Sequence, residues 1–186
     1  MVTPGMTEEK LALMCKQADP QARKALYERY GGMLMAICTR YTGDSESARD
    51  VLHDGFIRIF QSMDKFTYQG EGSLKAWLSR VIVNEALGYL RRRAVKTQQE
   101  VLVDEIPDTE EEDDGVSDIP RSVLMKFIRE LPEGYRSVFN LYVFEEKSHK
   151  EIGKLLGITE HTSSSQFYRA KSLLIKKINE YRKKYE

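Results

Sequence analysis

An acidic stretch between residues 98 and 119 is the feature that most constrains how this chain can fold. It holds ten Asp or Glu residues and no Lys or Arg, and five of the acids are consecutive at 110–114. Carboxylates this close repel one another and resist burial, and the prolines and the glycine nearby interrupt a helix. We therefore predict two domains joined by a flexible acidic linker, with the ranges 6–97, 98–118 (the linker) and 119–186.

The net charge of zero hides an uneven distribution. Residues 1–97 carry 15 Lys or Arg against 11 Asp or Glu, and residues 120–186 carry 14 against 8. Two basic pieces favour a polyanionic partner, although basic solvated faces also occur on proteins without one. The sequence has no apolar run of about 18 residues, so we expect no insertion into a membrane and a cytoplasmic protein.

The first domain is predicted to be helical throughout. Pro20 suits the first turn of a helix that runs to Tyr41, and Asp44 is the expected N-cap of the next helix. That helix has a stripe at helical spacing, formed by Ala48, Val51, Leu52, Gly55, Phe56, Ile59 and Phe60. Ser73 is the expected N-cap of a long helix to about Lys96. Its predicted core positions are Leu74, Leu78, Val81, Ile82, Ala86 and Leu90, with Glu85 at their flank.

The second domain is also predicted to be all-α, and it contains a helix-turn-helix pattern. Ser148 and Glu151 have the spacing of a capping box, and Gly157 follows the short helix that this box begins. Thr159 then caps a longer helix that runs to about Tyr185. A short helix, a glycine turn and a longer helix are typical of a DNA-binding helix-turn-helix.

The second helix of this motif begins with short polar side chains that suit base edges. In the major groove, Gln166 suits adenine, while Arg169 and Lys171 suit guanine or phosphate. The alternative is a solvated helix start without a ligand.

A second candidate surface lies in the first domain. Trp77 shares a helix side with Arg80, Asn84 and Arg91, and aromatic rings beside cations suit unpaired bases. Trp77 is equally compatible with a place in the core, and the cations after residue 90 with a role at the helix dipole.

The sequence offers no candidate catalytic residue, cofactor site or metal site. The three histidines are scattered without cysteine partners, and neither a phosphate loop nor GxGxxG is present. The protein is therefore not expected to be an enzyme.

Three segments resemble the conserved regions of bacterial sigma factors. Residues 48–60 resemble the part of the second region that binds the polymerase clamp helices, and residues 74–93 resemble the segment that opens and reads the minus-10 element. Residues 131–170 resemble the fourth region, which reads the minus-35 element. Order and spacing both match, and the absence of other sigma regions is typical of the small extracytoplasmic-function group.

The resemblance implies roles for individual residues. It implies contacts with the clamp helices of core RNA polymerase for Asp50, His53, Asp54, Ile57 and Arg58. The flap of the polymerase is a further expected contact of the chain. It implies contacts with the melted minus-10 strand for Phe66, Tyr68, Trp77, Arg80, Asn84 and Arg91. The neighbouring cation Arg92 is predicted to contact the same strand. At the minus-35 element, the resemblance implies contacts for Lys150, Ser164, Ser165, Tyr168 and Arg169. The polar side chains of the recognition helix add Thr162, Gln166 and Lys171 to the expected set.

The resemblance also implies partners. These are core polymerase, promoter DNA and an anti-sigma factor, and the acidic linker is expected between the polymerase's template and RNA-exit channels. His53 stands where glutamine is usual, and Gly88 where aspartate is common. The serine-rich start of the recognition helix lacks a basic residue often found there, and the chain looks similar to sigma factors of Bacteroidetes. The alternative function is a stand-alone helix-turn-helix regulator.

Overall fold

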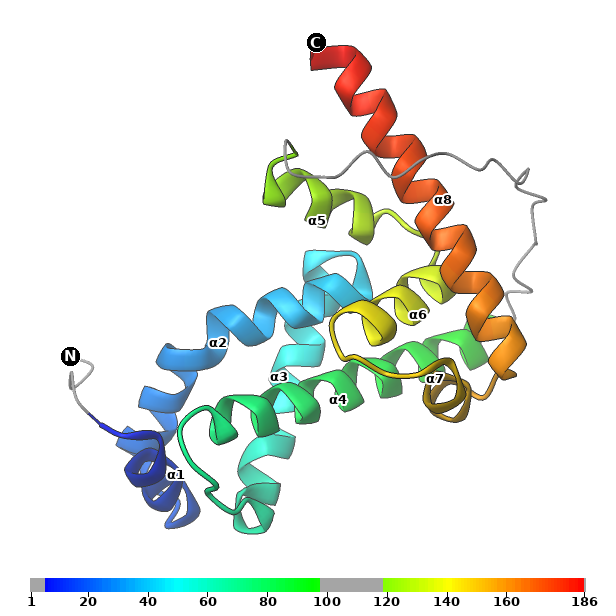
Figure 1. Ribbon diagram of the computed structural model, residues 1–186. Coiled ribbons are helices and arrows are strands. Elements are labelled where there is room, and N and C mark those ends of the chain that lie inside the picture. Colours follow the sequence, from blue (N-terminus) through cyan, green and yellow to red (C-terminus); the bar gives the residue numbers. More distant parts are fainter. Residues whose placement is uncertain (1–5, 98–118, 186) are drawn as a thin grey trace. The chain divides into compact units, whose positions relative to one another are not determined.

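A computed structural model describes residues 6–97 and 119–185, and all regular structure in these residues is helical (Figure 1). The prediction of an all-α fold is therefore confirmed for the described residues. The chain divides into two compact units, residues 1–93 and 94–186. The predicted linker lies outside the described residues.

The first unit holds four α-helices and a short 3-10 helix. They are α1 (Glu8–Lys16), α2 (Pro20–Thr42), α3 (Ser45–Ser62), η1 (Met63–Lys65) and α4 (Ser73–Thr97). The second unit holds α5 (Arg121–Arg129), α6 (Glu133–Val143), α7 (His149–Leu156) and α8 (Glu160–Tyr185). No helix in the described segments combines the length and apolar character that crossing a bilayer requires.

Side-chain caps explain where α2 and α3 begin. The Asp19 carboxylate accepts a hydrogen bond from the Ala22 N–H at 2.7 Å, and Asp44 accepts one from the Ser47 N–H at 2.8 Å. Both satisfy donors that lack a partner within the helix. Ser73 departs from its expected N-cap role. It is the first residue of α4, and its hydroxyl donates to the Gly70 carbonyl at 2.6 Å, inside the preceding loop.

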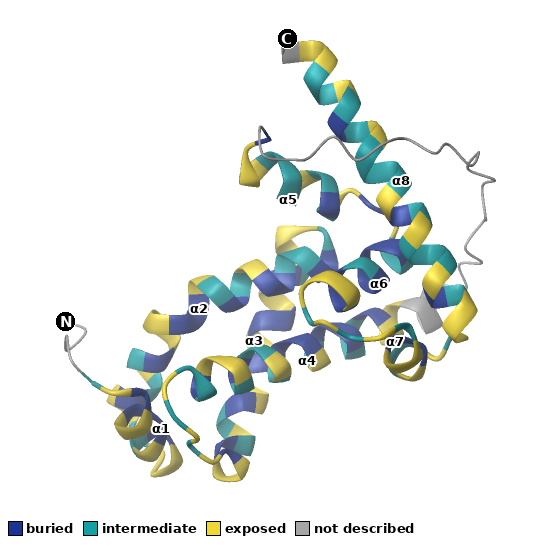
Figure 2. Ribbon diagram, viewed as in Figure 1, coloured by how far each residue is buried: buried dark blue, intermediate teal, exposed yellow. Residues whose placement is uncertain are grey.

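The stripe predicted on α3 is buried, apart from Phe60 at its end, which is half-buried (Figure 2). On α4 the buried face differs from the prediction at three positions. Val81 is only half-buried, whereas Val83 and Leu87 are in the core. Val81 is four residues from Trp77 and seven from Gly88, so helical geometry puts it on the outward side.

The core of the second unit forms where α6 packs on α8. Leu131, Tyr135 and Ala170 are buried there, with Phe139, Leu173 and Leu174 packed against them. Val138, Leu141 and Ile152 are also buried, and Ile152 belongs to α7. Packing of α7 against the same two helices fixes how the long helix α8 is presented to solvent.

The helix-turn-helix is formed as predicted. Ser148 and Glu151 make a complete capping box at the start of α7, and Gly157 ends that helix with a left-handed φ of 72°. Thr159 accepts a hydrogen bond from the Thr162 N–H at 3.0 Å and so caps α8. Gly153 permits the tight turn, because a Cβ there would stand 2.7 Å from the Ile158 carbonyl oxygen.

Candidate nucleic-acid interfaces

The outward face of α3 is exposed along its whole length. Asp50, His53, Asp54, Ile57 and Arg58 are all exposed, as the sequence pattern predicted. Ile57 is 44% exposed, which makes it a large apolar side chain set among charged ones. A polar surface with an apolar side chain at its centre is suited to binding another protein.

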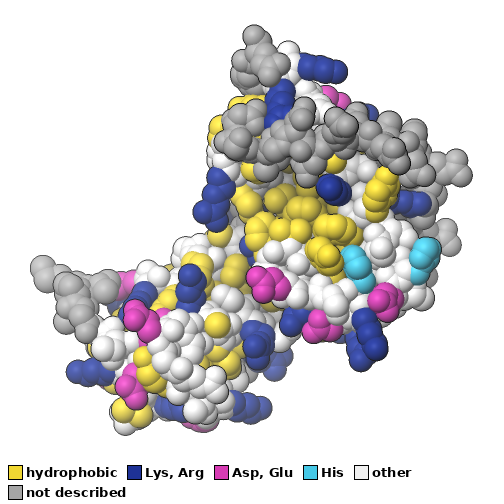
Figure 3. Space-filling model, viewed as in Figure 1, with side chains coloured by type: hydrophobic (Ala, Val, Ile, Leu, Met, Phe, Trp, Pro, Cys, Tyr) yellow, Lys and Arg dark blue, Asp and Glu magenta, His cyan; other side chains and the backbone are white. Residues whose placement is uncertain are grey.

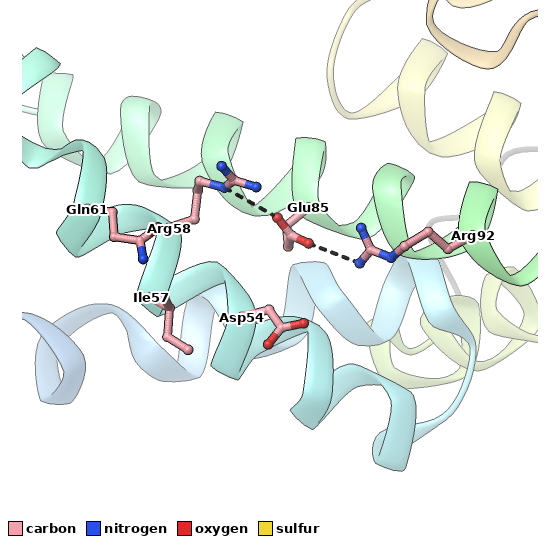
Figure 4. A pocket seen from close by; sticks show the side chains of 6 residues that line it. All are labelled: Asp54, Ile57, Arg58, Gln61, Glu85 and Arg92. Atoms are coloured by element: carbon pink, nitrogen blue, oxygen red, sulfur yellow. Dashed lines mark hydrogen bonds and ion pairs between the residues drawn. The ribbon is translucent and has the colours of Figure 1, made fainter.

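A shallow pocket lies between this face and α4. Its lining consists of Asp54, Ile57, Arg58, Gln61, Glu85 and Arg92 (Figure 4). Glu85 stands between two arginines, with Arg92 Nη2 3.1 Å from its Oε1 and Arg58 Nε 3.8 Å from its Oε2. The sequence placed Glu85 beside the core stripe but gave no sign of this shared ion pair, because Arg58 belongs to another helix.

The outward side of α4 carries the polar residues predicted to contact the minus-10 strand. The side chains of Arg80, Asn84, Arg91 and Arg92 are exposed there, while Trp77 is half-buried. The Trp77 ring packs against Phe66, with centroids 5.4 Å apart and planes at 50°. Trp77 thus has one side in the fold and part of its surface in solvent, a position between the two predicted alternatives.

The prediction for Phe66 is wrong in one respect. Phe66 is only 3% exposed, so it has no free face on which a base could stack. Its ring instead supports Trp77, because burying an aromatic side chain is strongly favourable when a neighbouring ring covers it. Tyr68, two residues further along the same loop, is half-buried and keeps accessible surface.

Glu8 holds the loop before α4 in place, and sequence reasoning missed it. Its carboxylate accepts one hydrogen bond from the Tyr30 hydroxyl and another from the Gly72 N–H, both at 2.8 Å. Glu8 is 7% exposed. Burial, together with the Glu8 carboxylate, raises the pKa of Tyr30 to about 12. No local pattern indicates a contact between residues 64 positions apart, so only the folded chain reveals it.

Polar residues of α8 divide between an outward face and a packed face. Ser164, Tyr168 and Lys171 are exposed and follow one another at steps of four and three. Tyr168 is 47% exposed, a large fraction for an aromatic side chain. This spacing places the three side chains on one side of the helix, where a groove can reach them. Ser165 is half-buried beside them, and its hydroxyl donates to the His161 carbonyl.

Three other residues predicted to contact bases are engaged within the unit. The Gln166 amide lies against α6, 3.4 Å from where a Cβ of Gly134 would stand. Arg169 Nη1 donates to the Tyr135 hydroxyl at 3.4 Å, and the Thr162 hydroxyl is 2.8 Å from that of Thr159. Gln166 falls on the same side as the buried Ser163 and Ala170, and this periodicity, already visible in the sequence, accounts for its place.

The start of α7 is tied to α8 by a histidine that the sequence did not single out. His149 Nδ1 is 3.0 Å from the hydroxyl of the fully buried Ser163. The His149 ring also stacks on Tyr142, with centroids 4.7 Å apart and planes at 17°. Its chain neighbour Lys150 is exposed, as a contact with phosphate requires.

Figure 3 shows hydrophobic side chains gathered on the surface over α6, whose C-terminal end exposes Tyr142 and Val143.

Both cysteines are free and buried, and burial raises the pKa of Cys15 to about 11 and that of Cys38 to about 12. Neither thiol is therefore ionised near neutral pH. Within residues 6–97 and 119–185, no three His, Cys, Asp or Glu side chains are grouped closely enough to hold a metal ion.

Comparison with known proteins gives two family matches. Sigma-70 region 2 matches residues 26–95, and Sigma-70, region 4 matches residues 121–174. The first match includes α3 and most of α4, and the second includes the helix-turn-helix.

Curated relatives match over almost the full length of the chain. The ECF RNA polymerase sigma-E factor of Haemophilus influenzae is 26% identical over 93% of this chain and 96% of its own. The RNA polymerase sigma-H factor of Pseudomonas aeruginosa is 23% identical over 91% and 92%.

A solved chain described as the sigma factor RpoE of Bartonella quintana, in complex with the anti-sigma factor NepR, is 20% identical. That match covers 84% of this chain and 96% of the other, with a TM-score of 0.49. Because the two matched regions together cover two thirds of the chain, in the order that the sequence predicted, the protein belongs to the extracytoplasmic-function group of the sigma-70 family and directs RNA polymerase to promoters.

Proposed function

We propose that the two matched regions divide the work of initiation between three helix faces. The outward face of α3 binds core RNA polymerase, the outward side of α4 meets the melted minus-10 strand, and the outward face of α8 reads the minus-35 element. The observation that carries this proposal is the exposure of all three faces in the folded units. Residues needed only for the core would instead be buried.

On α3, the proposed polymerase contacts are Asp50, His53, Asp54, Ile57 and Arg58. The exposed Ile57 supplies apolar area, and the acids and bases around it supply orientation. In the clamp helices, we expect basic side chains opposite Asp50 and Asp54. His53 donates or accepts a hydrogen bond where a carboxamide is usual.

On α4, the proposed contacts are the exposed side chains of Arg80, Asn84, Arg91 and Arg92, together with Tyr68 and the accessible part of Trp77. Phe66 acts behind Trp77 as a support. Arginines next to aromatic rings bind phosphates while unpaired bases stack, which is the pattern that single strands require.

On α8, Ser164, Tyr168 and Lys171 carry the proposed base and phosphate contacts, with Ser165 beside them and Lys150 on α7 near phosphate. Thr162, Gln166 and Arg169 contribute by fixing α8 against its cap and against α6. A helix-turn-helix reads DNA accurately only when its second helix is held rigidly, so both sets serve one function.

We further propose a cytoplasmic protein without catalysis of its own, controlled by an anti-sigma factor, because small sigma factors act on polymerase inside the cell and are commonly held inactive. The serine-rich start of α8 supports a place among the sigma factors of Bacteroidetes. It also suggests a minus-35 sequence different from that of other groups.

The decisive experiment is run-off transcription with core RNA polymerase from the source organism, on a pool of its promoter fragments. Transcripts that depend on this protein and on a shared upstream sequence would support the proposal and reveal the promoter. Failure of folded protein, beside an active control sigma factor, would favour a stand-alone DNA-binding regulator. That alternative predicts duplex binding by the chain without polymerase.

A further inference from the structure

Arg92 does not extend away from α4 but folds back along it. Its Nη2 donates to Glu85 Oε1 at 3.1 Å, two helical turns earlier in the chain. The path crosses Gly88, because Arg92 Nη1 is 3.4 Å from where a Cβ of Gly88 would stand. A Cβ at residue 88 would only touch the guanidinium, whereas a longer side chain would compete with it for this space.

Glu85 is in a position where its charge needs compensation. Its side chain is only 12% exposed, whereas those of Arg92 and Arg58 are 59% and 65% exposed. Removing a carboxylate from water costs free energy unless a cation stays close to it. The two arginines can move into solvent at little cost, but Glu85 cannot.

Arg58 provides a second cation on the opposite side of the same carboxylate. Its Nε is 3.8 Å from Glu85 Oε2, and Figure 4 shows Glu85 between the two guanidinium groups. If Arg92 leaves, Glu85 therefore still has a neighbouring positive charge. Arg92 is the closer, hydrogen-bonded partner of Glu85, and Arg58 is the second cation that stays near Glu85 when Arg92 leaves.

We propose that Glu85 is a positioning residue that competes with DNA phosphate for Arg92, and that Arg58 compensates Glu85 when Arg92 moves to the DNA. The proposal rests on the proposed function, in which Arg92 contacts the melted strand. In the free protein Glu85 withholds one cation from nucleic acid, and contact with a strand recovers it by exchange of ion-pair partners.

The test measures binding of a fluorescent single-stranded DNA oligonucleotide of random sequence to the full chain, by anisotropy between about 50 and about 200 mM salt. For Glu85→Gln we expect binding roughly twofold to fivefold tighter at low salt, because the Glu85–Arg92 ion pair, in which the arginine is exposed, no longer competes with DNA phosphate. One additional phosphate contact should also steepen the slope of log affinity against log salt by about 0.7.

The gain must depend on Arg92. Glu85→Gln combined with Arg92→Gln should bind no better than Arg92→Gln alone, and its salt slope should match that of the single variant. Arg58→Gln alone should weaken binding, because Glu85 then has no second cation and holds Arg92 more firmly. Combined with Glu85→Gln, the same substitution should have no effect, because the competing carboxylate is gone.

Glu46→Gln is the matched control. It removes the same charge from an exposed site in the first turn of α3. This site is also close to α4, because the hydroxyl of its neighbour Ser47 accepts a hydrogen bond from the Tyr89 hydroxyl of that helix. It should leave the salt slope unchanged. Thermal melting of every variant separates loss of the fold from an altered slope.

The outcomes distinguish this inference from the proposed function. If the wild type binds and Arg92→Gln weakens it, but Glu85→Gln changes neither affinity nor slope, competition by Glu85 is refuted and the DNA contact stands. Failure of the wild type to bind at low salt, or indifference to Arg92→Gln, would overturn the DNA-facing role of Arg92 and this inference with it.

Discussion

Ile82 of α4 occupies the space into which a side chain at Gly55 of α3 would project. A Cβ on Gly55 would overlap the Ile82 Cδ1 atom, so the glycine lets the two helices approach closely. This approach has a consequence one turn further along each helix. There it brings Glu85 within ion-pair distance of Arg58.

Gly55→Ala should therefore destabilise the first unit. The added methyl group must displace Ile82, and overpacking of this kind lowers the free energy of unfolding by about 1–3 kcal/mol. Denaturant unfolding followed by circular dichroism measures the change. Gly32→Ala is the control, because Gly32 has nothing within 4 Å of its Cβ position and alanine favours the helix there. Equal stability of the two variants would contradict the close packing described here.

Gly153→Ala should disturb the turn of the helix-turn-helix. The obstacle is the Ile158 carbonyl oxygen, which belongs to the backbone and cannot rotate aside as a side chain can. We expect a loss of about 1–3 kcal/mol in stability and weaker minus-35-dependent transcription. Gly134→Ala, which meets only the movable Gln166 amide, should be milder in both assays. Wild-type transcription from Gly153→Ala would count against a rigid turn.

His53→Ala combined with Asp54→Ala should weaken binding to core RNA polymerase while sparing the fold, because both side chains are exposed. Removing central contacts from a protein interface commonly lowers affinity about tenfold or more. Titration of labelled polymerase measures the affinity, and melting temperature reports the fold. Lys24→Ala with Glu28→Ala, an exposed ion pair on α2, is the matched control. Unchanged affinity of the α3 variant would refute the proposed polymerase face.

Tyr168→Ala and Gln166→Ala should have different effects. Tyr168 is exposed on α8, so its loss should reduce transcription from the organism's own promoters about tenfold with little change in stability. Gln166 lies against α6, so its loss should change stability more than promoter preference. Transcription from promoters with each minus-35 base altered would separate the two. A changed base preference in Gln166→Ala alone would reverse the assignment.

The capping box of α7 should give stability that depends on pH. Hydrogen bonds from the Ser148 N–H and hydroxyl, aided by the nearby Lys147, hold the pKa of Glu151 below its ordinary value. A carboxylate with a lowered folded-state pKa stabilises the fold above its unfolded pKa, and this contribution is lost as the pH falls through the folded pKa. Glu151→Gln still satisfies the cap but does not titrate, so its stability should lack this acid-dependent component. Parallel unfolding curves of both proteins at neutral and acidic pH make the comparison, and identical pH dependence would contradict it.

Much of the local structure follows from neighbouring residues. Asp44, the Ser148–Glu151 box and Gly157 act within a few residues of their own position, and the structure confirms each of them. The exposed face of α3 was predictable for a related reason, since a helix with one apolar stripe must present its remaining side chains to solvent. The family resemblance could also be found from the sequence, because it rests on motifs and on their order along the chain.

What the sequence determined by itself is the all-helical class, the caps of α3, α7 and α8, and the polar faces of α3, α4 and α8, because these depend on spacing along one helix. Only the tertiary structure decided which side chains on those faces are available. Packing buried Phe66 behind Trp77 and placed Glu85 between Arg58 and Arg92. These contacts join residues from different elements or distant turns, and their geometry depends on how closely the helices pack, which no local pattern specifies.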